Sequence, residues 1–282
     1  MDIQKVAIGE EKYPELLRQI PDAPAELYYV GNLEILKRTC CAVVGTRRMT
    51  AYGETQAFRF AKELSERGVC IVSGLAYGID KAAHEGALEG EGGTVAVLAQ
   101  GLPDIQPAAH IDLARRIVAK GGLLVSERLA GGEFFKTDYL VRNRIIAGLS
   151  EATLVVEAPL KSGAMNTAKH ALDYGRDVAA IPGRIGDENS VGTNTLIQRG
   201  AGLVLGPWEV GEMLEITWTA RRVQLEGLSA DIYAVLRRGP RSPAELAERF
   251  KDLRGLYEKL AELELQGVIK FTKELRYAVC SG

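Results

Sequence analysis

The sequence has few residues of the kinds that build metal sites or disulfide frameworks. Its 282 residues include only 4 cysteines and 3 histidines. The cysteines Cys40, Cys41, Cys70 and Cys280 lack the spacing of zinc ligands, and the histidines are scattered, so neither a metal site nor a cofactor is expected. Three of the cysteines lie in or beside apolar runs, which favours free buried thiols and a reducing, cytoplasmic location.

Long hydrophobic runs and a strong net charge are also missing. No apolar run approaches the roughly 20 residues of a membrane span, and the polar start Met1-Asp2-Ile3-Gln4-Lys5 does not resemble a signal peptide, so no membrane partner is expected. The net charge is −2, so any nucleic-acid site has to be a local basic cluster. With 46% hydrophobic and 26% charged residues, the composition is that of an ordinary globular protein.

Short apolar runs alternate with helical patterns from residue 40 onward. This alternation predicts an α/β fold with a doubly wound, mostly parallel, Rossmann-like sheet. In such sheets ligands bind at the carboxyl ends of the strands, where several loops containing Gly or Ser follow. The expected strands are 41–44, 69–73, 94–99, 123–126, 153–157 and 178–181, and the expected helices after the first are 79–88, 111–119, 142–149 and 163–174.

The first strand of this series leads into the loop Gly45-Thr46-Arg47-Arg48 and then into an amphipathic helix. Backbone N–H groups and the positive end of the helix dipole favour anions at such a junction. Gly45 allows close approach, Thr46 offers a hydroxyl group, and Arg47 offers a planar fork that suits phosphate. The loop therefore predicts a phosphate site. It matches neither the dinucleotide fingerprint nor the P-loop, and a solvated surface loop is the alternative.

Further motifs follow in a characteristic order. They are Val43-Val44-Gly45-Thr46-Arg47; Ser73-Gly74-Leu75-Ala76-Tyr77-Gly78-Ile79-Asp80 with His84; Val95-Ala96-Val97-Leu98; Gly122-Leu123-Leu124-Val125-Ser126-Glu127; Arg142-Asn143-Arg144-Ile145-Ile146; Val155-Val156-Glu157-Ala158 with Ser162-Gly163 and Thr167-Ala168; Ile181-Pro182-Gly183; and Gly192-Thr193-Asn194. Together, over about residues 12–207, they resemble the DNA-processing protein A family, also called DprA or Smf.

The resemblance implies an extended Rossmann-type domain with a basic pocket for single-stranded DNA. It also implies a protein that is not an enzyme, that protects incoming DNA and loads the recombinase RecA during natural transformation, and that is usually a homodimer. The family usually has Phe-Pro where this chain has Tyr139-Leu140, but a tyrosine ring can still stack on a base. The DNA-binding residues implied here are Gly45, Thr46, Arg47, Lys136, Tyr139, Arg142, Asn143, Arg144, Ser162 and Gly163.

Two other classes of function stay open. A nucleotide-processing hydrolase of the "lonely guy" type needs a glutamate where this chain has His170, but Asp80 and His84 are four residues apart and could form an acid–base pair. The simpler interpretation is that Asp80 caps its helix and His84 binds the neighbouring loop. The third class is a sensor of a small nucleotide or second messenger that uses the same loops.

Four segments are expected along the chain: a lead-in packed on the α/β domain (1–39), a Rossmann-like DNA-binding domain (40–214), a linker (215–226) and a winged-helix domain (227–282). In the last segment, Ser242-Pro243-Ala244-Glu245 predicts a capping box, and three helical patterns precede a hairpin. The expected recognition helix is rich in acidic residues, which favours protein contact or weak DNA contact over reading of the major groove.

Overall fold

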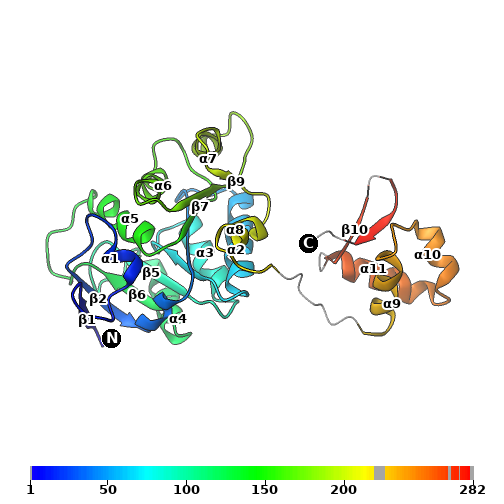
Figure 1. Ribbon diagram of the computed structural model, residues 1–282, viewed down its shortest axis with the longest axis horizontal. Coiled ribbons are helices and arrows are strands. Elements are labelled where there is room, and N and C mark those ends of the chain that lie inside the picture. Colours follow the sequence, from blue (N-terminus) through cyan, green and yellow to red (C-terminus); the bar gives the residue numbers. More distant parts are fainter. Residues whose placement is uncertain (1, 219–225, 266–267, 273, 280–282) are drawn as a thin grey trace. The chain divides into compact units, whose positions relative to one another are not determined.

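The computed structural model describes residues 2–218, 226–265, 268–272 and 274–279 (Figure 1). The chain forms two compact units, Met1–Thr217 and Trp218–Gly282, each with its own hydrophobic core. Within these described ranges, no helix is both long and apolar enough to cross a membrane.

A nine-stranded sheet crosses the described part of the N-terminal unit in the order β1-β2-β6-β5-β4-β3-β7-β8-β9. The strands from β3 onward pair in parallel, whereas β1 pairs with β2, and β2 with β6, in antiparallel fashion. The predicted doubly wound, mostly parallel sheet is therefore confirmed. The strands are β1 (Gln4–Ala7), β2 (Glu26–Gly31), β3 (Cys40–Val44), β4 (Cys70–Ser73), β5 (Thr94–Leu98), β6 (Leu123–Ser126), β7 (Ala152–Val155), β8 (Asp177–Ala180) and β9 (Gly202–Leu203).

The first 39 residues belong to this sheet, because β1 and β2 form its antiparallel edge. Successive side chains of β2 point to opposite faces. Leu27 and Tyr29 join the core on one face, while Val30 joins the core on the other. The boundary that the sequence suggested near residue 40 therefore falls inside a continuous sheet.

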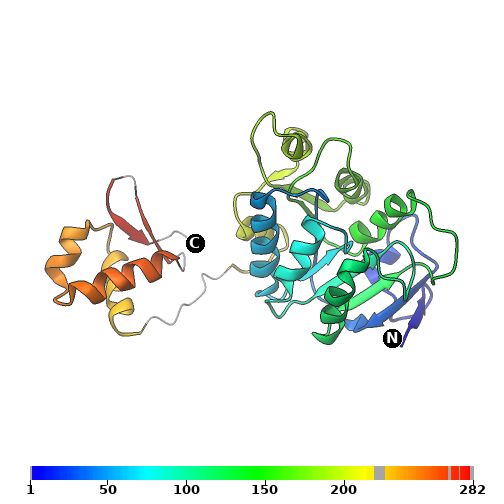
Figure 2. The same ribbon diagram turned by 180° about the vertical axis from the view of Figure 1, so that it is seen from behind.

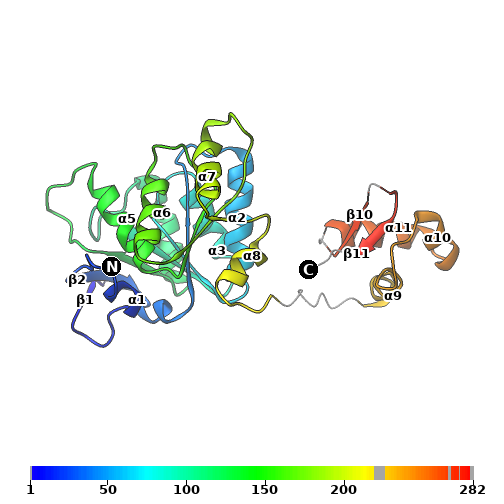
Figure 3. The same cartoon turned by 45° about the horizontal axis from the view of Figure 1, so that its top comes forward.

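Helices cover both faces of the sheet, as Figures 2 and 3 show from two directions. In β5, Val95 and Val97 pack into the core that contains Ile145 of α5, while Ala96 and Leu98 pack into the core on the other face. Helices α2, α3 and α4 lie side by side on one face, and α5 packs against α6 on the other. The helices are α1 (Glu15–Arg18), α2 (Ala51–Ser65), α3 (Ile79–Ala87), α4 (Ile111–Ala119), α5 (Asp138–Gly148), α6 (Gly163–Asp173), α7 (Glu188–Gln198) and α8 (Pro207–Met213), with 3-10 turns η1 (Leu33–Lys37) and η2 (Ala108–His110).

The described residues of the C-terminal unit form three helices followed by an antiparallel hairpin, the order predicted from the sequence. The capping box is confirmed, since the Glu245 N–H donates to the Ser242 hydroxyl oxygen and the Ser242 N–H donates to the Glu245 carboxylate. The predicted linker falls partly outside the described residues. The elements are α9 (Gly227–Leu236), α10 (Pro243–Arg249), α11 (Leu253–Leu265), β10 (Ile269–Phe271) and β11 (Tyr277–Val279).

Candidate nucleic-acid interface

The loop after β3 is fixed by Glu157, which follows β7 at the same edge of the sheet. The Glu157 carbonyl accepts a 2.7 Å hydrogen bond from the Thr46 N–H. Its buried carboxylate accepts from the N–H of Thr50 at 2.9 Å and from the Thr50 hydroxyl group at 2.5 Å. A Cβ atom at Gly53 would overlap this carboxylate. Glu157 thus places a carboxylate at the amino end of α2, bonded to Thr50.

Arg47 instead extends from the loop into solvent and meets α5. Its guanidinium carbon lies 4.6 Å from the centroid of the Tyr139 ring, a cation–π contact between a loop and a helix far apart in the sequence. The Tyr139 ring in turn makes an edge contact with Phe134, with centroids 5.2 Å apart and planes at 90°. Lys136 lies exposed in the turn before α5. A cation and a row of aromatic rings are thereby assembled at the carboxyl edge of the sheet.

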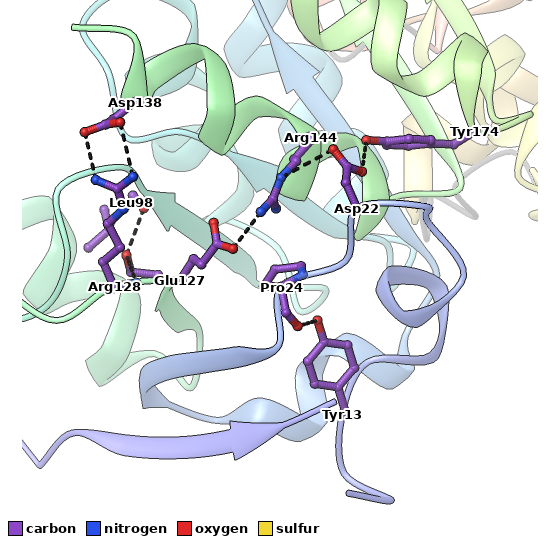
Figure 4. Close-up of polar contacts among 10 residues, drawn as sticks. Tyr13, Asp22, Pro24, Leu98, Glu127, Arg128, Asp138, Arg144 and Tyr174 are labelled. Atoms are coloured by element: carbon purple, nitrogen blue, oxygen red, sulfur yellow. Dashed lines mark hydrogen bonds and ion pairs between the residues drawn. The ribbon is translucent and has the colours of Figure 1, made fainter. Parts of the chain in front are cut away.

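The amino end of α5 is held by Asp138, whose carboxylate is buried. Arg128 donates to both oxygens of this carboxylate, at 2.8 and 3.2 Å (Figure 4). The Phe135 N–H donates to it as well, at 2.9 Å. Because a bidentate guanidinium–carboxylate pair has a defined geometry, the turn that carries Phe134, Lys136 and Tyr139 is fixed relative to β6.

Arg142, expected to bind DNA, is buried beneath this edge. Its guanidinium donates to the carbonyl oxygens of Gly74, at 2.8 Å, and Val97, which lie at the ends of β4 and β5. Burial lowers the pKa of Arg142 to about 10, although the nearby Asp80 carboxylate favours the charged form, so the side chain stays charged at neutral pH. Arg142 thereby joins α5 to two strands of the sheet.

Asn143 and Arg144 are also buried and bound to the protein. The Asn143 amide donates to the Gly163 carbonyl at 3.1 Å, which ties α5 to α6. Arg144 pairs with Glu127 at 2.6 Å and with Asp22 at 3.5 Å, and so holds the N-terminal segment against α5 (Figure 4). Asn143 and two of the guanidinium nitrogens of Arg144 therefore have partners inside the protein, whereas Nη1 of Arg144 is buried without a hydrogen-bond partner.

The loop between β4 and α3 is held by buried polar groups. The Asp80 carboxylate accepts from the N–H groups of Gly74 and Ala76, and burial raises the pKa of this carboxyl group. His84 accepts from the Leu75 N–H at 3.3 Å, and its other ring nitrogen lies 2.7 Å from the Thr94 hydroxyl oxygen. Burial lowers the pKa of His84 to about 3. His84 binds the neighbouring loop as interpreted, whereas Asp80 binds N–H groups of that loop and does not cap α3, whose N-cap is Gly78.

Ser162 and Gly163 begin α6 at the same edge of the sheet. The Ser162 hydroxyl group caps the helix by accepting from the Met165 N–H at 3.4 Å. Gly163 is exposed, and its carbonyl oxygen accepts from Asn143. Of the residues implied to bind DNA, Arg47, Lys136 and Gly163 are exposed, and Tyr139 is half-buried.

Comparison with known proteins identifies the family. The model of the DNA recombination-mediator protein A family matches residues 4–215, which is the greater part of the chain. The chain belongs to this family. It is 45% identical over 210 residues to the Smf protein of Escherichia coli, covering 74% of this chain but 56% of that protein. It is 42% identical over 204 residues to DNA processing protein DprA of Streptococcus pneumoniae, covering 72% of each.

Solved structures of family members have the same fold. DprA from Streptococcus pneumoniae superposes with a TM-score of 0.70 at 40% identity, covering 74% of each chain. DNA processing protein A from Helicobacter pylori, studied for its single-stranded DNA binding mode, superposes with a TM-score of 0.68 at 30% identity, covering 76% of this chain and 96% of that one. The recombination-mediator family therefore shares the α/β unit described here.

Two residues at this edge went unnoticed in the sequence as site components. The Phe134 ring packs against Tyr139 and so adds a second aromatic ring to the site. The glycines before it interrupt any helical or strand pattern that could have indicated this in the sequence. The Asp138 carboxylate fixes the turn before α5 by accepting from the Phe135 N–H. The three-residue spacing of the two residues was the one signal in the sequence for this bond. Among the described residues of this family member, no group of three or more His, Cys, Asp or Glu side chains could hold a metal ion.

Proposed function

We propose that this protein binds single-stranded DNA at a rim site formed by Arg47, Lys136 and Tyr139. The observation that carries the proposal is the stacking of the Arg47 guanidinium on the Tyr139 ring at the open edge of the sheet. Such a pair combines a phosphate-binding fork with an aromatic surface in one place. Single-stranded DNA offers both complementary groups, phosphates and unstacked bases, within one nucleotide.

Each rim-site residue has a separate task. Arg47 donates its outward N–H groups to a phosphate oxygen, and Lys136 adds a second positive charge beside the backbone of the strand. Tyr139 packs against a base. Because every base has a π-face and every nucleotide a phosphate, binding at this site is largely independent of sequence and weakens as salt increases.

The remaining implied residues support the rim site. Gly45 and Thr46 set the path of the loop that presents Arg47, since a Cβ atom at Gly45 would overlap Ile79. Arg142 holds α5, and therefore Tyr139, over the ends of β4 and β5. Gly163 is exposed at the start of α6 and extends the proposed path of the strand beyond the rim site.

Family membership supports the wider role. We propose that the protein acts in the cytoplasm during natural transformation, protects incoming single strands as a homodimer and loads RecA onto them, without catalysis of its own. The hydrolase alternative is disfavoured because the imidazole of His170 stands where that chemistry needs a carboxylate. The His170 ring stacks on Tyr174, with centroids 5.8 Å apart.

The C-terminal unit fits a winged-helix module that contacts a protein partner better than one that reads DNA. Two basic side chains of α11 are already paired with acidic residues of the same helix. Arg254 bonds Glu258 at 3.0 Å, and Lys259 bonds Glu262 at 2.6 Å. With Glu264, this helix carries three acidic side chains against two basic ones, so its net charge does not attract a duplex.

One binding experiment tests the proposed function. Fluorescence anisotropy should show that the 282-residue chain binds labelled oligothymidylate much more tightly than a blunt duplex of equal length, with affinity that falls as salt rises. Equal affinity for the duplex would contradict the proposal. Displacement of the oligonucleotide by a mononucleotide at comparable concentration would support the sensor alternative instead. A RecA assembly assay on the same strand tests the loading step.

A further inference from the structure

Exposed apolar side chains are concentrated in the segment that leads into α5. Phe134 is 40% exposed and Phe135 is 57% exposed, and they are adjacent in the sequence. Leu140, in the first turn of α5, is exposed as well, but it is aliphatic. Single exposed apolar residues are common, whereas two adjacent exposed aromatic residues beside a binding site mark a recognition surface.

The backbone beneath the two phenylalanines is fixed, which separates this segment from an unstructured loop. The Phe135 N–H donates to the Asp138 carboxylate at 2.9 Å, and the Asp138 N–H donates back to the Phe135 carbonyl at 3.0 Å. Arg128 holds the same carboxylate with two hydrogen bonds (Figure 4). A buried carboxylate with three donors therefore sets the position from which the Phe135 ring enters solvent. The backbone of Phe135 therefore needs no further ordering when a ligand packs on that ring.

Phe134 connects this segment to the rim site directly. Its ring meets the Tyr139 ring edge to face, and the Tyr139 ring carries the Arg47 guanidinium at 4.6 Å. Lys136 follows Phe135 immediately in the chain. The order from the cation outward is therefore Arg47, Tyr139, Phe134, and Phe135 is the next residue of the chain. A strand that contacts Tyr139 and continues toward this turn would next contact the Phe134 ring.

We propose that Phe134 and Phe135 form a second base-stacking position, which binds a base of the same single strand next to the nucleotide held at the rim site. The inference rests on the proposed function, since it extends that site by one aromatic step. Bases are the occupants that this surface fits, because the neighbouring Arg47 and Lys136 attract a polyanion and an uncharged apolar partner would gain nothing from them. The position is tolerant of sequence because stacking needs only a π-face.

The test compares two phenylalanine variants with an aliphatic control from the same segment. Phe135→Ala should weaken binding of oligothymidylate roughly fivefold to a hundredfold, the range measured for loss of one base–aromatic stack. Phe135→Leu, which keeps apolar volume but has no π-face, should recover little, while Phe135→Trp should recover most. Leu140→Ala is the matched control, because Leu140 is 46% exposed but aliphatic, and it should leave affinity unchanged.

A second ligand shows whether the lost interaction is with a base. An oligonucleotide of equal length with abasic sites throughout should bind the Phe135→Ala variant as weakly as it binds the unaltered protein. Unchanged oligothymidylate affinity in Phe135→Ala would overturn the inference, as would an equal loss on the abasic strand or an equal loss in Leu140→Ala. The last result would indicate an apolar surface for a protein partner or a second copy of this chain.

The outcome for the second position is separable from the outcome for the rim site. If the unaltered protein does not prefer single strands, the proposed function fails before any variant is compared. If Arg47→Ala weakens binding and Phe135→Ala does not, the rim site stands and only the second stacking position is rejected. Thermal unfolding of each variant, together with Phe135→Trp, distinguishes a lost contact from a lost fold.

Discussion

The Arg47 guanidinium packs on the ring of Tyr139, with its central carbon 4.6 Å from the ring centroid. Arg47 comes from the loop after β3, and Tyr139 comes from the first turn of α5 on the opposite face of the sheet from α2. A guanidinium that lies on a ring is held in one orientation, while its N–H groups still point outward around the plane. The pair therefore places a phosphate-binding fork beside an aromatic surface before any ligand arrives.

Replacement of Arg47 should weaken DNA binding without unfolding the protein. A charge-assisted contact with phosphate contributes about 1.5–3 kcal/mol, so Arg47→Ala should reduce single-strand affinity roughly tenfold to a hundredfold. Arg47→Lys should recover only part of it, because a point charge neither forks nor stacks as a guanidinium does. Arg48→Ala, which alters the next exposed arginine of the loop, should cost less. Anisotropy and thermal unfolding check this, and unchanged binding in a folded Arg47→Ala variant would place the site elsewhere.

Tyr139 should tolerate the ring that its relatives use but not the loss of a ring. Tyr139→Phe keeps both the π-face under Arg47 and the stacking surface, so its affinity for oligothymidylate should stay within about twofold of the unaltered protein. Tyr139→Ala removes both and should cost as much as Arg47→Ala. A double Arg47→Ala, Tyr139→Ala variant should then lose less than the two single losses added, because the residues are in contact. Strict additivity would argue that the pair does not act together.

The fold could be predicted from sequence because its signals are local. The alternation of apolar runs and helical patterns gave every strand from β3 to β8, and the buried face of α2 followed from the spacing of Ala57, Phe60, Ala61 and Leu64. Helix α7 was missed because its sequence, rich in Ser, Thr, Asn and Gly, has weak helix propensity and no apolar stripe. Tertiary packing stabilises it, since its Gly192 N–H donates to the Ala158 carbonyl at 2.8 Å.

The candidate site was harder to predict, because sequence does not distinguish an arginine that is exposed to solvent from one that is buried and bonded within the protein. Arg47 and Arg142 were both expected to contact DNA, yet one is exposed and the other is 6% exposed. The difference depends on where the carbonyl oxygens of Gly74 and Val97 lie in three dimensions. The role of Glu157 at the amino end of α2 is equally non-local, since it comes from the loop after β7.

Arg142 should affect stability where Arg47 affects binding. Removal of its guanidinium leaves the carbonyl oxygens of Gly74 and Val97 without this donor. It also removes the positive charge that α5 places near the buried Asp80 carboxylate. Each buried carbonyl left without its donor costs about 1–3 kcal/mol, so Arg142→Ala should lower the urea midpoint strongly. The urea midpoint of Arg142→Lys should lie between those of Arg142→Ala and the unaltered protein. If Arg142→Ala remains as stable as the unaltered protein but loses DNA affinity, the arginine contacts DNA after all.

The buried His84 should make the fold sensitive to acid. Its pKa is lowered to about 3 in the folded protein by burial, with smaller contributions from His110 and Arg142, against an ordinary value near 6.5. Between these values the unfolded chain binds a proton that the folded chain does not. The free energy of unfolding should therefore fall by about 1.4 kcal/mol per pH unit as pH drops below 6.5.

His84→Gln removes this titration, so the difference in unfolding free energy between the two proteins should change with that slope between pH 6.5 and 4. The raised pKa of Asp80 acts in the opposite direction, since the folded protein then takes up a proton first, but it is present in both proteins and cancels in the difference. Urea unfolding at a series of pH values measures the effect. Parallel pH profiles for the two proteins would show that His84 does not titrate on unfolding.

Removal of the C-terminal unit should leave single-strand binding nearly intact. The rim-site residues all lie in the N-terminal unit. The described core residues of the two units form separate clusters. The α11 cations Arg254 and Lys259 each have an acidic neighbour on the same helix. A chain that ends after Ala220 should therefore bind oligothymidylate within about threefold of the full chain, a change below ~1 kcal/mol. Anisotropy on both forms, with circular dichroism to verify folding of the shorter one, measures this. A hundredfold loss in a folded truncation would make the C-terminal unit the DNA-binding part, because no rim-site residue would have been touched.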